Sequence, residues 1–127
     1  MEEEIWSKKK ICIVDDDPNL REIYLMKFNQ EGFEVFLATN GEEGLQVIRE
    51  KKPDIILLDL QMPVKNGIEV LEELDQDAEL SKIPVIVLTN IDNEEGYKEV
   101  GKFETRFYLI KSLTTPQKAV DYVKEVL

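Results

Sequence analysis

The amino-acid sequence predicts an α/β fold, in which helices cover both faces of a parallel sheet, from two observations. Five short apolar segments recur along the 127 residues, and a stretch with helical spacing follows each of them. Three of these segments are almost continuously apolar, which is typical of strands covered on both faces. Strands that alternate with helices in this way form a doubly wound parallel sheet.

The strands are expected where four or five consecutive residues are mainly apolar and polar or turn-forming residues bound the segment. In chain order, the expected strands are residues 11–14, 34–38, 55–58, 84–88 and 107–110.

The first two helices are predicted with their capping residues. Asp17 can cap the first helix, with Pro18 at its first helical position. The inward face of this helix is expected to carry Leu20, Ile23, Tyr24 and Phe28. Asn40 can cap the second helix, whose apolar side includes Leu45 and Ile48.

The other three helices differ in how strongly the sequence marks them. The third has apolar residues at three-residue spacing, namely Ile68, Leu71 and Leu74. The fourth, over residues 93–102, contains two glycines, and the fifth opens with Thr115 and Pro116. The inward residues of this last helix are expected to be Ala119, Val120, Val123 and Leu127.

Length and composition favour one domain over residues 1–127, in which residues 1–9 lead into the first strand. The formal net charge of −11 argues against direct binding to nucleic acid, because phosphates attract lysine and arginine. The single cysteine, Cys12, cannot form an internal disulfide, and neither a secretory signal nor a membrane-spanning run is visible. We therefore expect a cytoplasmic protein that binds neither nucleic acid nor membrane.

Polar residues follow four of the expected strands: Asp15 and Asp16, then Asp59, Thr89 and Lys111. The carboxyl ends of parallel strands meet at one edge of the sheet, so these side chains are expected to gather there. Adjacent carboxylates repel unless a cation neutralises them, and oxygen ligands suit Mg²⁺. Asp59 could then be the nucleophile toward a phosphoryl donor, with Mg²⁺ and Lys111 offsetting charge and Thr89 donating a hydrogen bond.

Each of these residues also has a structural explanation. Asp17 is more simply a helix cap than a ligand, Thr89 could be a turn residue, and Lys111 could be a solvated lysine. Asp15 and Asp59 are harder to explain in this way, since an unpaired buried carboxylate is costly. The chain has no histidine, which excludes Ser-His-Asp and Cys-His catalysis and any phosphohistidine of its own.

From residue 10 to residue 127 the sequence resembles the response-regulator receiver family of two-component signalling. The segment Asp59-Leu60-Gln61-Met62-Pro63, with Gly67 following, is similar to the family's phosphoacceptor motif D-x-x-M-P-x-x-x-G. The other matches are Asp15 and Asp16 (acidic pair), Thr89 (hydroxyl), Lys111 (lysine) and Tyr108 (aromatic switch position). The resemblance implies a flavodoxin-like (βα)5 fold with strand order 2-1-3-4-5. It also implies a Mg²⁺ site formed by Asp15, Asp16, Asp59 and the backbone carbonyl of Gln61.

The function implied by the resemblance is that of a phosphoacceptor switch rather than an enzyme. Asp59 would take a phosphoryl group from a sensor histidine kinase or a histidine phosphotransfer protein, and the chain would slowly dephosphorylate itself. The fourth helix, fifth strand and fifth helix would form the face that signals to a downstream protein. No DNA-binding segment follows the fifth helix in this sequence, so output is expected to come from docking of that partner.

The sequence departs from the family pattern at three places. Ser112 stands where proline, preceded by a cis bond, is usual, and Asn90 stands where a small residue is usual. Residues 104–107 read Glu-Thr-Arg-Phe, where Gly-Ala-x-x is common. Because a cis bond before a non-proline residue costs about 3–4 kcal/mol, we expect the Lys111–Ser112 bond to be trans.

Two other functions remain open. Ser112 and the altered segment 104–107 are compatible with an interaction module that has the receiver fold but no longer switches. A haloacid-dehalogenase-like phosphatase is suggested by the D-x-D in Asp15-Asp16-Asp17 after the first strand. Against the phosphatase, Asn19 replaces the usual Thr or Val, and the chain looks short for the larger domain of that family.

Overall fold

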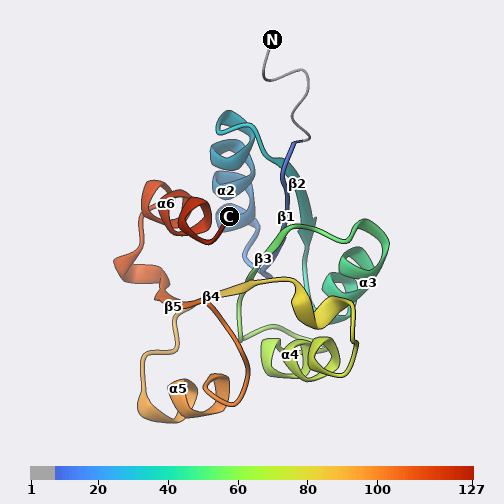
Figure 1. The fold of residues 1–127 in the computed structure, drawn as a ribbon. Coiled ribbons are helices and arrows are strands. Elements are labelled where there is room, and N and C mark those ends of the chain that lie inside the picture. Colours follow the sequence, from blue (N-terminus) through green and yellow to red (C-terminus); the bar gives the residue numbers. More distant parts are fainter. Residues whose placement is uncertain (1–7) are drawn as a thin grey trace.

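Five parallel strands form one sheet in the order β2-β1-β3-β4-β5 (Figure 1). The structure is a computed structural model that describes residues 8–127, so most of the expected lead-in lies outside the described residues. The strands are Lys10–Val14 (β1), Glu34–Ala38 (β2), Ile55–Leu58 (β3), Val85–Thr89 (β4) and Phe107–Ile110 (β5). The predicted fold class and strand order are confirmed.

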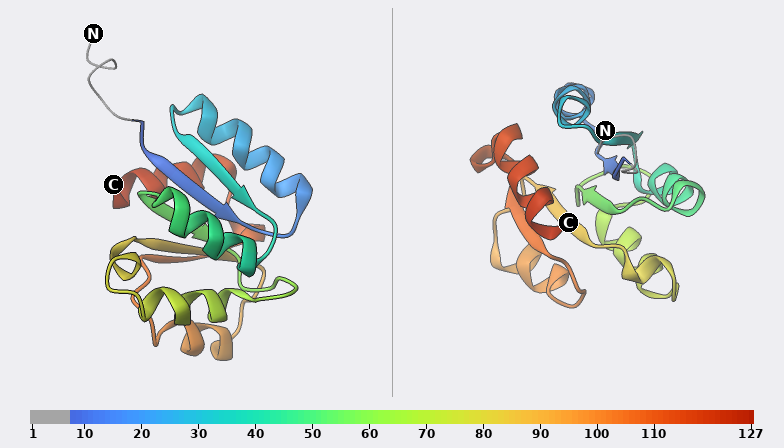
Figure 2. Two further views of the ribbon diagram at one scale, coloured as in Figure 1. Left: turned by 90° about the vertical axis from the view of Figure 1, so that its right-hand side faces the viewer. Right: turned by 45° about the horizontal axis from the view of Figure 1, so that its top comes forward.

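Helices cover both faces of this sheet, as the sequence predicts (Figure 2). The helices are Pro18–Gln30 (α2), Gly41–Lys51 (α3), Gly67–Asp75 (α4), Glu94–Val100 (α5) and Pro116–Val126 (α6). Two 3₁₀ turns, Leu80–Lys82 (η1) and Lys111–Leu113 (η2), were not predicted. In the part of the chain that the structure describes, no helix has the length and apolarity needed to span a membrane.

Alternate residues of β1 show why its sequence is almost continuously apolar. Ile11 and Ile13 pack into a cluster that contains residues of α2 and α6. Cys12 and Val14 point the other way, into a cluster with residues of α3 and α4. Each strand side chain therefore meets a helix on its own side, because successive residues of a strand face opposite sides of the sheet.

Three details of the sequence prediction are wrong. β4 begins at Val85 rather than at Pro84, since proline has no N–H for the ladder, although the Pro84 carbonyl accepts a hydrogen bond from Ile56. Ile23 of α2 is 52% exposed and Leu127 is 45% exposed, so neither side chain is inward. Helical spacing places Ile23 beside the buried stripe without bringing it under a neighbouring element.

The helix caps agree closely with the sequence. Asp17, Asn40 and Thr115 cap α2, α3 and α6 as predicted, and Asn93 caps α5, which begins one residue later than predicted. α4 has a cap that was missed: the Asn66 side chain accepts from the Glu69 N–H, and the Glu69 side chain accepts from the Asn66 N–H. This reciprocal pair fixes the start of α4 shortly after Asp59.

Candidate functional site

The first acidic residue, Asp15, is held directly beyond the carboxyl end of β1. Its N–H donates to the Ala38 carbonyl, which continues the β1–β2 pairing by one residue. Its Oδ1 accepts from the Asp17 N–H at 2.9 Å, while Asp17 itself caps α2. Asp15 is only 2% exposed, and the adjacent Asp16 is exposed. The acidic pair is thus one buried carboxylate beside one that faces solvent.

The second acidic position, Asp59, follows β3 and is 4% exposed. Its Oδ1 accepts from the N–H groups of Leu60 and Gln61, at 2.7 and 3.3 Å. Gly67 packs against this turn, and a Cβ on Gly67 would lie 2.3 Å from the Asp59 carbonyl oxygen, so only glycine fits. The glycine of the D-x-x-M-P-x-x-x-G motif therefore allows α4 to start close to Asp59.

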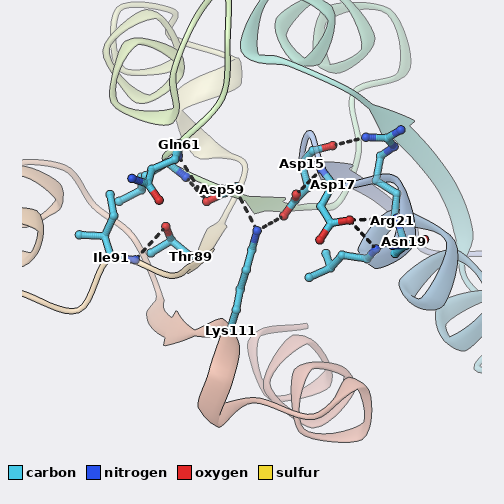
Figure 3. Close-up of polar contacts among 11 residues, drawn as sticks. Asp15, Asp17, Asn19, Arg21, Asp59, Gln61, Thr89, Ile91 and Lys111 are labelled. Carbon is cyan, nitrogen blue, oxygen red and sulfur yellow. Dashed lines mark hydrogen bonds and ion pairs between the residues drawn. The ribbon is translucent and has the colours of Figure 1, made fainter.

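Lys111, the first residue after β5, joins the two buried acids (Figure 3). Its Nζ lies 2.8 Å from Asp15 Oδ2 and 3.0 Å from Asp59 Oδ2. Burial lowers the pKa of the Lys111 ammonium, but its hydrogen bonds to both carboxylates outweigh burial and hold this pKa above its usual value. The lysine is therefore protonated and shared between the two carboxylates.

The Asp15 carboxylate is less well compensated than the Lys111 ammonium. Burial raises the pKa of the Asp15 carboxyl, and the hydrogen bonds from Lys111 and Asp17 offset only part of this rise. The Asp59 charge adds to it. Lys111 gains from two carboxylates, whereas Asp15 shares the Lys111 ammonium with Asp59. The ion pair therefore stabilises the charged form of Lys111 more than that of Asp15.

One carboxylate oxygen each from Asp15, Asp16 and Asp59 lies within 4.8 Å of the other two. Three carboxylates outnumber the two nearby cations, the Lys111 ammonium and the Arg21 guanidinium, so this edge keeps a net negative formal charge. A divalent cation with a preference for oxygen ligands matches this charge and donor set. The acidic edge, defined as Asp15, Asp16 and Asp59, could therefore hold a metal ion.

Thr89 and Tyr108 meet on a single residue, Ile91, which the sequence did not identify. The buried Thr89 hydroxyl accepts from the Ile91 N–H at 3.4 Å, and the Tyr108 hydroxyl donates to the Ile91 carbonyl at 2.7 Å. The Tyr97 ring packs edge-on against Tyr108, with ring centroids 4.8 Å apart. Burial, with Tyr97 nearby, raises the pKa of Tyr108 to about 12, so its hydroxyl remains a donor at neutral pH.

The segment after Lys111 is where the sequence departs from the family pattern. No cis peptide bond occurs in residues 8–127, so the Lys111–Ser112 bond is trans, as predicted. Lys111–Leu113 forms the 3₁₀ turn η2, and Leu113 is exposed. Lys111 reaches both acids with this trans bond in place.

The family is shown by comparison with known proteins. A family profile described as the response regulator receiver domain matches residues 11–124. The chain belongs to this family. Protein PilH of Pseudomonas aeruginosa is 40% identical over 103 residues, which cover 80% of this chain and 84% of PilH. The polar-differentiation response regulator DivK of Brucella anthropi is 30% identical over 119 residues, which cover 94% of this chain and 96% of DivK.

Solved structures agree with this assignment. The chemotaxis protein CheY4 of Vibrio cholerae matches with a TM-score of 0.88 and 25% identity, over 95% of this chain and 100% of CheY4. A CheY-like receiver protein from Methanospirillum hungatei matches with a TM-score of 0.87 and 27% identity, over 94% of both chains. The chain is a receiver domain of two-component signalling, and these matches favour neither the non-switching module nor the phosphatase.

Proposed function

We propose that Asp59 is the residue that accepts the phosphoryl group, and that a phosphohistidine on another protein donates it. The observation that carries this proposal is the placement of the Asp59 carboxylate. It lies 3.0 Å from Lys111 Nζ, within the acidic edge and at the end of a buried strand. These 127 residues contain no histidine, so a phosphohistidine donor would lie outside them.

In the proposed step a carboxylate oxygen of Asp59 bonds to phosphorus while the phosphorus–nitrogen bond of the phosphohistidine breaks. The electron pair of the broken bond stays on the imidazole nitrogen, so no further reactant is needed. Lys111 would offset charge on the phosphoryl oxygens. The Thr89 hydroxyl oxygen accepts from the Ile91 N–H, and this bond does not use the O–H that Thr89 would donate to the phosphoryl group.

Mg²⁺ is the proposed cofactor, with Asp15, Asp16 and Asp59 as its side-chain ligands. The net negative formal charge and the all-oxygen donor set at the acidic edge support it. The backbone carbonyl of Gln61 remains the predicted fourth ligand. When bound, the ion would supply positive charge beside the phosphoryl oxygens.

Intact mass spectrometry after incubation with acetyl phosphate and MgCl₂ tests the acceptor. Wild type should gain the mass of one phosphoryl group, and Asp59→Asn should gain none. Asp54→Asn is the matched control. Asp54 comes directly before β3 and Asp59 directly after it, so the two acids lie at opposite ends of the same strand. An adduct on Asp59→Asn, or none on wild type and Asp54→Asn alike, would overturn the proposal.

The partners follow from the same proposal: a sensor histidine kinase or histidine phosphotransfer protein upstream, and a downstream protein that docks on α5, β5 and α6. The contact between Tyr108 of β5 and Ile91, ahead of α5, supports this output face, since it joins β5 to the loop after β4. We further propose a cytoplasmic location and slow self-catalysed loss of the phosphoryl group. The unpaired, buried thiol of Cys12 is compatible with a reducing compartment.

A further inference from the structure

Arg21 of α2 makes a contact with the acidic edge that the proposed chemistry does not use. Its Nη1 donates to the backbone carbonyl oxygen of Asp15 at 2.7 Å (Figure 3). This carbonyl lies beyond the end of β1, and no backbone N–H of residues 8–127 reaches it. Arg21 therefore satisfies a carbonyl that the sheet leaves without a partner.

The other polar groups of Asp15 are already held, as described above: its N–H by Ala38, Oδ1 by Asp17 and Oδ2 by Lys111. Only the carbonyl depends on Arg21. This carbonyl belongs to the same planar peptide unit as the N–H and Cα of Asp16. Holding the oxygen therefore fixes the orientation of this peptide and, with it, the direction in which the Asp16 side chain points.

Asp16 has little else to hold it. It is exposed, and its carboxylate has no hydrogen bond or ion pair with other described residues of the chain. Its place in the acidic edge, within 4.8 Å of the carboxylates of Asp15 and Asp59, is thus set by its backbone. A rotation of the Asp15–Asp16 peptide would move the Asp16 carboxylate away from the other two.

We propose that Arg21 is a positioning residue for the metal site: through the Asp15 carbonyl it orients the Asp15–Asp16 peptide so that Asp16 shares a cation with the buried acids. The inference rests on the proposed Mg²⁺ site. For removal of Arg21, positioning and charge predict opposite changes in the affinity for Mg²⁺. Removing a guanidinium near three carboxylates should tighten cation binding by Coulomb attraction, whereas loss of positioning should weaken it.

The test is an NMR titration of the unphosphorylated protein with MgCl₂, following the amide shifts of residues around the acidic edge. Arg21→Met removes the donor but keeps the apolar stem, and Arg21→Lys keeps the charge without the guanidinium fork. Arg49→Met is the control, because it makes the same charge change at another arginine. Arg49 lies near the end of α3 and forms an ion pair with Glu73 of α4. Helices in this fold run back from the acidic edge, so the end of α3 lies at the far edge of the sheet.

Arg21→Met should raise the Kd for Mg²⁺ about tenfold, Arg21→Lys should raise it less, and Arg49→Met should leave it near the wild-type value. An unchanged or lower Kd in Arg21→Met would overturn the inference. If Arg21→Met does not fold, Arg21→Lys decides, and a wild-type Kd in that variant would also overturn it. Phosphorylation of wild type by acetyl phosphate separates the two proposals, since it tests Asp59 and not Arg21.

Discussion

Burial changes the chemistry of Cys12, the single cysteine of the chain. The residue is fully buried in β1, and desolvation, with Glu43 adding to it, raises the pKa of the thiol to about 12. A raised pKa means less thiolate at any given pH, and burial also keeps reagents away from the sulfur. We expect native Cys12 to resist alkylation by iodoacetamide at pH 8, as measured by intact mass.

An exposed thiol on the same chain gives the comparison. Native Cys12 should be labelled much more slowly than an exposed thiol, whose pKa is about 8.5, because a fully buried thiol reacts only when its strand opens. The control is Ser81→Cys, which adds a thiol at an exposed position of η1. Two adducts forming at equal rates on that variant would contradict the prediction.

Some residues of the acidic edge and its surroundings could be identified from the sequence, and others could not. Asp15 and Asp59 were identified because each ends an apolar strand, and a buried carboxylate needs a partner. Arg21 and Ile91 were not identified, because their contacts with Asp15 and with Thr89 and Tyr108 use backbone atoms. Backbone contacts depend on where the loop runs, and residue type does not report them.

Helix ends are a second level at which the sequence was informative. Aspartate, asparagine and threonine before the helices marked three of the caps, those of α2, α3 and α6, since their side chains accept from the first N–H groups. The signal for α4 was also present, as Asn66 stands three residues before Glu69, and it was overlooked. The sequence does not mark the end of α3. Lys52 adopts there the left-handed conformation for which glycine is usual.

Lys52 therefore offers a test of helix termination. Its φ of 45° is unfavourable for a residue with a Cβ, and its contact with Glu79 is an exposed ion pair of small energy. Lys52→Gly should raise the free energy of unfolding by up to about 1 kcal/mol. Lys51→Gly, at the last helical residue, should lower it by about 0.5–1 kcal/mol. Urea unfolding monitored by circular dichroism measures both, and a change of the same sign in the two variants would contradict this account.

Across the whole chain, the order of elements could be predicted because burial on both faces leaves apolar runs of a length typical of strands. The strand order came from the resemblance to the receiver family rather than from periodicity, since apolar patterns do not say which strands are neighbours. The gathering of Asp15, Asp59 and Lys111 then followed from the parallel arrangement, which places every strand end at one edge. That Lys111 shares its ammonium between Asp15 and Asp59 could be seen only from the distances in the structure.

The net charge and the acidic edge together predict how the stability of the whole molecule responds to salt. At −11 the chain repels itself, so any salt should raise the melting temperature by screening. Mg²⁺ should add a specific increment, because an ion that binds only the folded state stabilises it by about 1.4 kcal/mol at ten times its Kd. MgCl₂ should therefore raise the melting temperature more than NaCl does at equal ionic strength.

Two adjacent acids show whether that increment comes from the acidic edge. Asp16→Asn removes a carboxylate of the edge that has no other contact among the described residues, so it should lose most of the increment. Asp17→Asn makes the same charge change one residue later, and asparagine caps α2 as well as aspartate does, so this variant should keep the increment. Differential scanning calorimetry in the two salts measures the effect. An equal increment in both variants would place the bound cation away from Asp16, because the two substitutions differ only in which carboxylate they remove.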